Sequence, residues 1–193
     1  VIVVMWLMWG AHMFAMLGAR REKTLYVSIW YFMACFLGVG MLFLFNGLAI
    51  PTWFVTNTGN WWHSVSMYAG TNDAQVQWWF GHNAVAFVLT VPIVAISYYF
   101  IPKQANQPIY SYRLSLWSFW GLIFVYLWAG PHHMMYSTIP DWVQTLGMVF
   151  SLVLIIPSWG SMINLLLTMS GRWEQLKTDP IAKLLVIGST FYG

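Results

Sequence analysis

Charged residues are scarce in this chain of 193 residues. Aspartate, glutamate, lysine and arginine together make up 7% of it, against 60% hydrophobic residues. This composition excludes an ordinary soluble domain and is typical of an integral membrane protein. The alternation of apolar and polar residues that marks a transmembrane barrel strand is also absent, so helices are expected to span the bilayer.

Cysteine is nearly absent too. The single cysteine, Cys35, excludes an internal disulfide and is expected to be a small packing residue in an apolar helix. We expect no signal peptide, and we find no repeat or low-complexity tract. Because the chain begins at Val1 without a methionine and stops at Gly193 soon after an apolar stretch starts, we expect residues 1–193 to be a single membrane domain, an internal piece of a larger protein.

Long apolar stretches dominate the sequence instead. Five complete stretches lie at about residues 1–18, 25–50, 76–101, 114–136 and 142–169, and a sixth begins near residue 181. Each complete stretch is near or above the roughly 17–25 residues that a spanning helix needs. The sequence therefore predicts an all-α, polytopic bundle of five complete transmembrane helices and the start of a sixth.

Positive charge is missing from one side of this bundle. The connections at residues 51–75 and 136–141 hold Asp73 and Asp141 but no lysine or arginine. All eight basic residues follow the first, third and fifth stretches: Arg20, Arg21, Lys23, Lys103, Arg113, Arg172, Lys177 and Lys183. Basic loops stay cytoplasmic, so these three connections are expected to face the cytoplasm, and the basic excess needs no nucleic-acid partner.

The outer connection at residues 51–75 is rich in aromatic residues, and we expect it to lie at the membrane interface as part of an aromatic belt. Its histidine, His63, is expected to be a surface residue. The aromatic members of this connection include Trp53, Trp61, Trp62 and Tyr68.

Three of the five histidines are expected at one depth. His82 lies early in the third stretch, and His132 and His133 end the fourth. The two spans run in opposite directions, which brings all three side chains into the outer half of the bilayer. Pro131 disturbs the helix just before the pair and is expected to let both rings turn toward one point. Three neutral imidazoles suit copper, zinc or iron and leave a coordination position open.

The alternative is that each histidine bonds a backbone carbonyl and packs, which is the interpretation we favour for His12. Tyr126 lies seven positions before His133, two turns along the same helix face. Its hydroxyl is placed either to donate a proton and an electron beneath a metal or, as an ordinary aromatic, to bond the backbone. Ser115 and Tyr98 continue toward the cytoplasm as candidates for a proton path, although a serine such as Ser115, taken singly, is more often a helix-packing residue.

Several long segments of the sequence resemble one family. They are residues 77–84 (QWWFGHNA), 98–104 (YYFIPKQ), 110–115 (YSYRLS), 126–133 (YLWAGPHH), 140–142 (PDW) and 157–164 (PSWGSMIN). In this order they closely resemble the catalytic subunit of cbb3-type cytochrome c oxidases, which belong to the haem–copper oxidases. The resemblance implies that the bundle is part of a twelve-helix fold in a bacterial inner membrane.

The resemblance also implies roles for single residues. It makes His82, His132 and His133 the ligands of the active-site copper, opposite a high-spin haem iron. It makes Tyr126 a redox tyrosine that is covalently cross-linked to the ring of His82. Tyr98 and Ser115 match positions on the proton-input path from the cytoplasm.

The implied activity is reduction of dioxygen to water with electrons from cytochrome c, coupled to proton translocation. The implied cofactors are copper, a high-spin b-type haem and a low-spin haem b, and the axial haem ligands lie outside this chain. The implied partners are the haem c-bearing subunits of the oxidase complex, cytochrome c, dioxygen and the lipid bilayer.

Two rival interpretations remain. Nitric oxide reductases resemble these oxidases but carry a glutamate four residues after the first histidine and lack the tyrosine, whereas this chain has Ala86 and Tyr126. A non-enzymatic protein that binds or conducts a metal would need ligands repeated at several depths. Methionines are spaced in this way in the first stretch, but such stripes are usually packing residues: Met5, Met8, Met13 and Met16.

The sequence departs from the family at two positions. Ser118 and Met135 stand where family members often have histidine. We expect the first change to alter some detail of the proton path and the second to alter only packing near the outer face.

Overall fold

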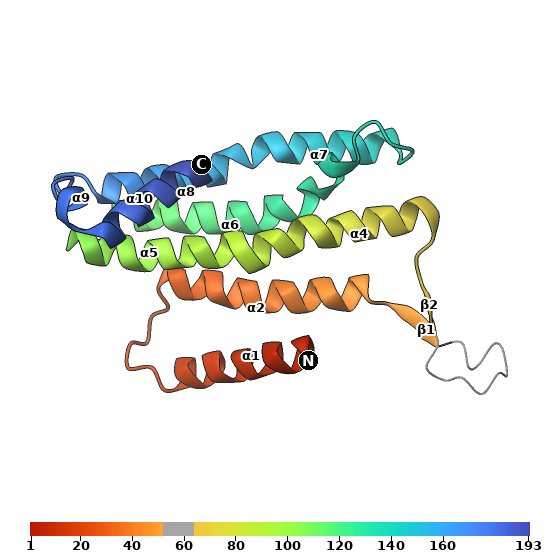
Figure 1. Cartoon of the computed structure of the whole chain (residues 1–193), viewed down its shortest axis with the longest axis horizontal. Coiled ribbons are helices and arrows are strands. Elements are labelled where there is room, and N and C mark those ends of the chain that lie inside the picture. The colour runs from red at the N-terminus through yellow and green to blue at the C-terminus, as the bar shows by residue number, and fades with distance from the viewer. Residues whose placement is uncertain (52–63) are drawn as a thin grey trace.

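The computed structural model describes residues 1–51 and 64–193 and is dominated by helices (Figure 1). Two short segments of other winding interrupt them: a π-helical turn, Ala86–Thr90, and a 3-10 turn, Gly130–Met134. The α-helices are α1 (Ile2–Gly18), α2 (Val27–Asn46), α4 (Gly70–Val85), α5 (Val91–Ala105), α6 (Tyr112–Ala129), α7 (Asp141–Val153), α8 (Ile155–Thr168), α9 (Gln175–Thr178) and α10 (Pro180–Tyr192).

Four helical segments of the described chain are long and apolar enough to cross a membrane: Val27–Asn46, Gly70–Ala105, Tyr112–Met134 and Asp141–Thr168. They confirm the predicted all-α polytopic membrane class. The first predicted span forms the apolar helix α1, which has 17 residues, and α10 is shorter still. Thus four of the five predicted complete spans form helical segments of 20 to 36 residues, and α1 lies at the lower limit of the spanning length.

The span that carries His82 starts earlier than the sequence predicted. It begins at Gly70 instead of near residue 76, and Asp73 lies in its first turn, where a negative charge is favourable beside the partial positive charge of the helix N-terminus. The preceding connection contains a small antiparallel hairpin of β1 (Ala49–Pro51) and β2 (Ser64–Ser66). Of the aromatic connection, Tyr68 donates a hydrogen bond to the Phe45 carbonyl at 3.1 Å; Trp53, Trp61, Trp62 and His63 lie outside the described residues.

The last predicted full span is broken at Leu154 into α7 and α8. Pro157 has no N–H, so the carbonyl of Val153 loses its usual helical partner. The proline itself is buried against α6, where a Cβ on Gly121 would lie only 3.1 Å from the Pro157 Cβ. The break therefore accompanies close packing of α6 on α8.

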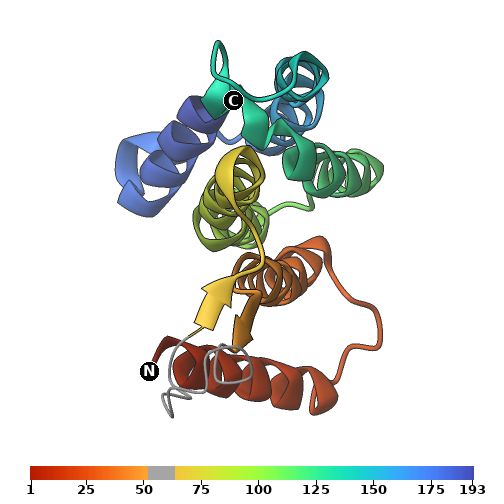
Figure 2. The same cartoon turned by 90° about the vertical axis from the view of Figure 1, so that its right-hand side faces the viewer.

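The helices pack mainly as antiparallel neighbours, with α2 on α5, α6 on both α7 and α8, and α10 against α5 and α8. α1 lies beside α2 at the edge of the bundle (Figures 1 and 2). The connections that carry basic residues gather at one end, on the left of Figure 1, and the β-hairpin and the α6–α7 connection gather at the other. The bundle thus has two chemically different ends, as the charge pattern predicted.

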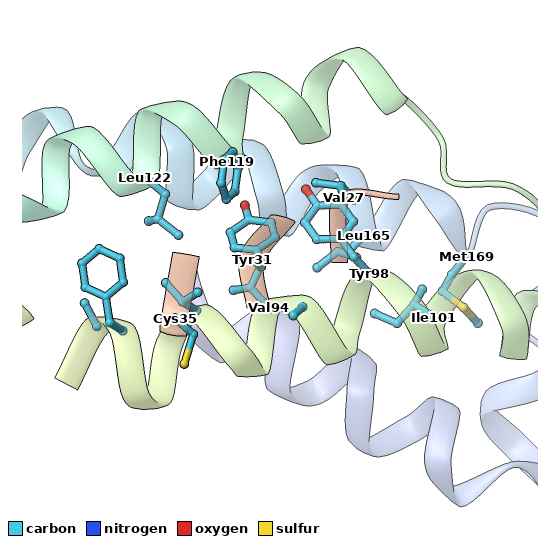
Figure 3. Packing of buried hydrophobic residues seen from close by; sticks show 14 of the residues in the cluster. Val27, Tyr31, Cys35, Val94, Tyr98, Ile101, Phe119, Leu122, Leu165 and Met169 are labelled. Carbon is cyan, nitrogen blue, oxygen red and sulfur yellow. The ribbon is translucent and has the colours of Figure 1, made fainter. Parts of the chain in front are cut away.

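Aromatic side chains fill the middle of the core (Figure 3). Tyr31 of α2 stacks on Tyr98 of α5 with ring centroids 5.8 Å apart, and Phe119 of α6 meets Tyr31 edge-on at 4.9 Å. Cys35 is buried in the same cluster, which confirms its expected role as a packing residue. This core packs α2, α5 and α6 together, and the candidate site lies beyond it, on α4 and the turn that follows α6.

Candidate metal centre

Three histidines converge at the end of the bundle opposite the basic connections. His82 lies in the last turn of α4, and His132 and His133 lie in the 3-10 turn that follows α6. One ring nitrogen from each lies within 4.8 Å of the others, and ring centroids are separated by 4.7 Å (His82–His132), 5.6 Å (His82–His133) and 4.4 Å (His132–His133). The convergence that the sequence predicted is present.

The winding of the backbone changes where the two adjacent histidines begin. α6 ends at Ala129, and the chain continues as a 3-10 turn from Gly130 through Pro131. A Cβ on Gly130 would lie 2.9 Å from the carbonyl oxygen of Trp78, so only glycine lets this turn lie directly against α4. The Gly130-Pro131 pair therefore brings the histidine turn to the helix that carries His82.

A tryptophan of α4 lies against the ring of His133. The ring of His133 stacks on Trp78, with centroids 4.2 Å apart and planes inclined by 15°. Trp78 lies four residues before His82 and so on the same face of α4. Sequence reasoning did not single out Trp78, although its i−4 spacing from a candidate ligand is a usable signal.

Tyr126 lies against His82. Their ring centroids are 4.8 Å apart and the ring planes are inclined by 35°. The two residues come from neighbouring helices, α6 and α4, and His82 is buried while Tyr126 is half-buried. The structure therefore brings the predicted tyrosine to the ring to which the resemblance assigned it.

Asn83 ties the two site helices together. Its side-chain amide donates a hydrogen bond of 3.3 Å to the carbonyl of Leu127 on α6. In a regular helix the N–H of residue 131 would bond that carbonyl, but Pro131 has none. Asn83 is fully buried, and its Oδ1 lies 3.4 Å from Nδ1 of His82. Sequence reasoning missed this residue, and the proline four positions after Leu127 was the signal that a donor was needed.

A widened π-helical turn, Ala86–Thr90, follows His82 by one turn. It precedes Pro92 at the start of α5, and π-turns inside helices frequently mark functional sites. Ala86 is fully buried in the apolar core. The position at which the nitric oxide reductases carry a glutamate is therefore packed with hydrocarbon here.

Toward the other end of the bundle, the structure does not join the two predicted path residues to each other. Tyr98 is fully buried, and its hydroxyl accepts a hydrogen bond of 3.5 Å from the amide of Asn164. That amide also donates to the Ser111 carbonyl at 2.9 Å. Ser115 donates a 2.6 Å bond to the carbonyl of Tyr112 in its own helix, as the packing interpretation predicts. Asn164 is a polar group near Tyr98 to which the sequence analysis assigned no role.

Several buried hydroxyl groups surround this region without a hydrogen-bond partner among the described residues. They come from α2, α6, α8 and α10: Tyr31, Ser118, Ser161 and Tyr192. Ser118 is one of the two positions at which the sequence was expected to depart from the family pattern. Unbonded hydroxyls in a dry core are costly, so this cluster is suited to ordered water.

His12 does not join the centre. His12 is exposed on α1, and α2 lies between α1 and the site helices (Figure 2). His63 lies outside the described residues. Met5, Met8 and Met16 are exposed on α1, and Met13 is buried. Met135 follows the 3-10 turn directly and is half-buried.

Apolar spanning helices around three convergent histidines define a polytopic membrane protein with a candidate metal centre. A family model described as "Cytochrome C and Quinol oxidase polypeptide I" matches residues 1–193. The chain belongs to this family of polytopic helical membrane proteins.

Individual relatives agree with this assignment. Over the whole chain it is 50% identical to "Cbb3-type cytochrome c oxidase subunit CcoN1" of Stutzerimonas stutzeri. Over 96% of its length it is 48% identical to "Cytochrome c oxidase subunit 1" of Rhodobacter capsulatus. The chain spans 39% and 34% of the lengths of these two proteins, so the activity of a complete subunit reaches this chain only as a proposal.

Proposed function

We propose that this chain is part of the catalytic subunit of a cbb3-type terminal respiratory oxidase. The complete enzyme reduces dioxygen to water with electrons from cytochrome c and couples this reaction to proton translocation. The observation that carries the proposal is the convergence of His82, His132 and His133 within 4.8 Å, with Tyr126 packed on His82.

His82, His132 and His133 are the proposed ligands of a copper ion. Their nitrogens are close enough to share one ion after small rotations of the rings, and imidazole suits copper. Three protein ligands leave a coordination position open, as catalytic metal sites require. When bound, the copper supplies electrons to dioxygen together with the high-spin haem iron.

Tyr126 is the proposed proton and electron donor of the centre. Its ring lies 4.8 Å from that of His82, so a two-electron oxidation by dioxygen, the proposed substrate, can join the two rings by a covalent bond while two hydrogens leave as protons. The phenol then supplies one proton and one electron when the bond between the oxygen atoms breaks. Having this donor within the site avoids release of partly reduced oxygen.

Tyr98 and Ser115 belong to the proposed route by which protons reach the centre from the cytoplasm. The buried hydroxyls of Tyr31, Ser118 and Ser161 have no hydrogen-bond partner in the described part of the chain, and they support the route because such groups bind water that can relay protons. Ser118 stands where family members often have histidine. At this position the proposed route therefore uses a neutral hydroxyl in place of an imidazole.

The rest of the assembly follows from the same proposal. A high-spin b-type haem and a low-spin haem b, ligated by residues outside this chain, complete the electron path, and haem c-bearing subunits pass electrons from cytochrome c. The basic connections face the cytoplasm of a bacterial inner membrane. The histidine centre then lies nearer the outer face, so protons cross most of the membrane to reach it.

Two rival functions are less well supported. The apolar surroundings of Ala86 and the position of Tyr126 disfavour a nitric oxide reductase-like site. A metal conduit would need ligands at several depths, whereas the described histidine cluster occupies one.

The first test is peptide mass spectrometry on the subunit isolated from its native membrane. We expect a linked pair of peptides containing His82 and Tyr126, lighter by two hydrogens than their sum. Separate, unmodified peptides from active enzyme would overturn the role of Tyr126.

Replacement Tyr126→Phe should leave copper bound and reduce turnover to a small fraction of the wild-type rate, because the phenolic proton and electron are lost. Copper analysis and oxygen consumption of the assembled oxidase measure both effects. The control is Tyr136→Phe, which changes a tyrosine that is 97% exposed. Substantial turnover of Tyr126→Phe would show that the phenol is dispensable.

A further inference from the structure

The structure assigns Ser151 of α7 as the positioning residue of His132: it binds Nδ1 of the ring and leaves Nε2 free to bind the metal. This inference rests on the proposed copper site and adds a residue to it. Neither the sequence motifs nor the spacing of the histidines pointed to Ser151. It is carried by two short hydrogen bonds and one close backbone approach.

The two hydrogen bonds share the serine hydroxyl. Nδ1 of His132 lies 2.6 Å from Ser151 Oγ, and the same Oγ donates a 2.6 Å bond to the carbonyl of Gly147 one turn earlier. The distance from Oγ to the carbonyl lies in the usual range of hydroxyl hydrogen bonds, and the distance from Nδ1 to Oγ is slightly shorter than most N–H···O bonds. The serine therefore lies between a ring nitrogen and a backbone oxygen.

The chemistry of the three atoms fixes the direction of both bonds. A carbonyl oxygen can only accept, and a serine hydroxyl has a single proton. If that proton pointed to His132, two oxygen lone pairs would face each other across 2.6 Å at Gly147. The consistent arrangement has Nδ1–H donating to Ser151 and the Ser151 hydroxyl donating to Gly147. In a neutral imidazole this leaves the lone pair on Nε2.

Close packing of α7 on the histidine turn makes this contact possible. A Cβ on Gly147 would lie 2.6 Å from the backbone nitrogen of His132 and 2.8 Å from the carbonyl carbon of Pro131. Only glycine admits such an approach. Gly147 and Ser151 are one helical turn apart, so the first lets the turn come near and the second binds its ring.

The three candidate ligands thus differ in what holds them. His133 stacks on Trp78, and His82 packs against Tyr126 with its Nδ1 3.4 Å from the Asn83 amide oxygen. Among the described contacts of the three rings, His132 has the shortest, the 2.6 Å contact with the Ser151 hydroxyl. A hydrogen bond of this kind orients a metal-binding histidine and raises its basicity, and its loss typically lowers metal affinity about 10- to 100-fold.

The test is Ser151→Ala in the complete, assembled oxidase, compared with Ser151→Thr, which keeps the hydroxyl. The matched control is Ser97→Ala, because Ser97 is buried and makes the same bond to a carbonyl four residues earlier (Ile93) without a histidine. Copper per haem is measured after dialysis against a graded copper chelator. The infrared band of carbon monoxide on the reduced copper is also recorded, because it reports the ligand set independently of turnover.

We expect Ser151→Ala to release copper at about 10- to 100-fold lower chelator concentration, with a shifted or broadened carbon monoxide band. Ser151→Thr and Ser97→Ala should behave as wild type. Unchanged copper retention and an unchanged band in Ser151→Ala would overturn the inference, as would equal loss in Ser151→Thr. Wild-type oxidase without copper would instead overturn the proposed metal site itself, so the two failures are distinct.

Discussion

At each end of the bundle, a proline leaves one helix carbonyl without its usual N–H donor, but the consequences for the two ends differ. At the histidine end, Pro131 leaves the Leu127 carbonyl without a helical donor, and Asn83 donates to it from α4 at 3.3 Å. At the basic end, Pro102 does the same to the Tyr98 carbonyl, and Tyr26 donates to it from the start of α2 at 3.0 Å. In each case a side chain from a neighbouring helix replaces a missing backbone N–H.

The consequences differ because the backbone continues differently after each proline. α5 continues through Pro102 to Ala105 as an α-helix, so at this end the polar contact only joins two helices. From Gly130 the chain instead winds as a 3-10 turn, and this turn carries both His132 and His133. At Pro102 the helix stays intact, so the hydrogen bond from Tyr26 contributes only to stability. At Pro131 the winding changes, so the hydrogen bond from Asn83 also positions the histidine turn. Variants of the two ends should therefore differ in metal binding more than in stability.

The largest expected effect is at the histidine turn. His132→Ala or His133→Ala in the full-length enzyme removes a proposed ligand, and we expect copper to fall to background and oxygen reduction to be abolished. Copper analysis and oxygen consumption measure these changes. His12→Ala is the control, because His12 is exposed on α1 and should change neither. Activity retained in either ligand variant would refute the assignment.

An intermediate effect is expected from Asn83→Leu, which removes the donor to Leu127 at the same end. A buried carbonyl left without a partner costs about 1–3 kcal/mol, so the free energy of unfolding should fall by that amount. Because α4 and α6 are no longer tied beside His82, copper should also be lost more easily. Thermal unfolding and chelator titration measure the two effects. If Asn83→Leu lowered stability but kept wild-type copper retention, the hydrogen bond at the histidine end would contribute only to stability, as the one at the basic end does.

Much of this architecture is encoded locally and was predicted. Apolar length predicts the helices, and opposite chain direction predicts that His82 meets His132 and His133. Such inferences need only the position of a residue along a helix, because rise per residue converts sequence into depth.

The features that the sequence did not predict depend on how each helix is rotated about its axis. Asn83 and Ser151 act through contacts with Leu127 and His132 on other elements, and no local pattern specifies that rotation. The break at Leu154 is a similar case, because a proline such as Pro157 signals a disturbance without saying whether the helix bends or restarts. The start of α4 at Gly70 was missed because polar first turns extend beyond the apolar stretch that defines a span.

The smallest expected effect is that of Tyr26→Phe at the basic end. The variant loses a half-buried hydroxyl bond to the Tyr98 carbonyl, which should lower the free energy of unfolding by about 1 kcal/mol. Copper retention should stay at the wild-type level, because no part of the histidine turn is touched. Loss of copper in this variant would break the distinction between the two ends.

The pH dependence of that stability difference sharpens the test. Burial, together with the nearby Tyr98 and Tyr112 hydroxyls, raises the pKa of Tyr26 to about 12 from its usual value of 10. Because the folded-state pKa is the higher one, the contribution of the protonated phenol is fully present below about pH 10 and is lost as the pH rises through about 12. The stability difference between wild type and Tyr26→Phe in thermal unfolding should therefore be constant from about pH 7 to 10 and should fall as the pH rises from about 10 to 12. A difference that stays constant through about pH 12 would mean that folding does not raise the pKa of Tyr26.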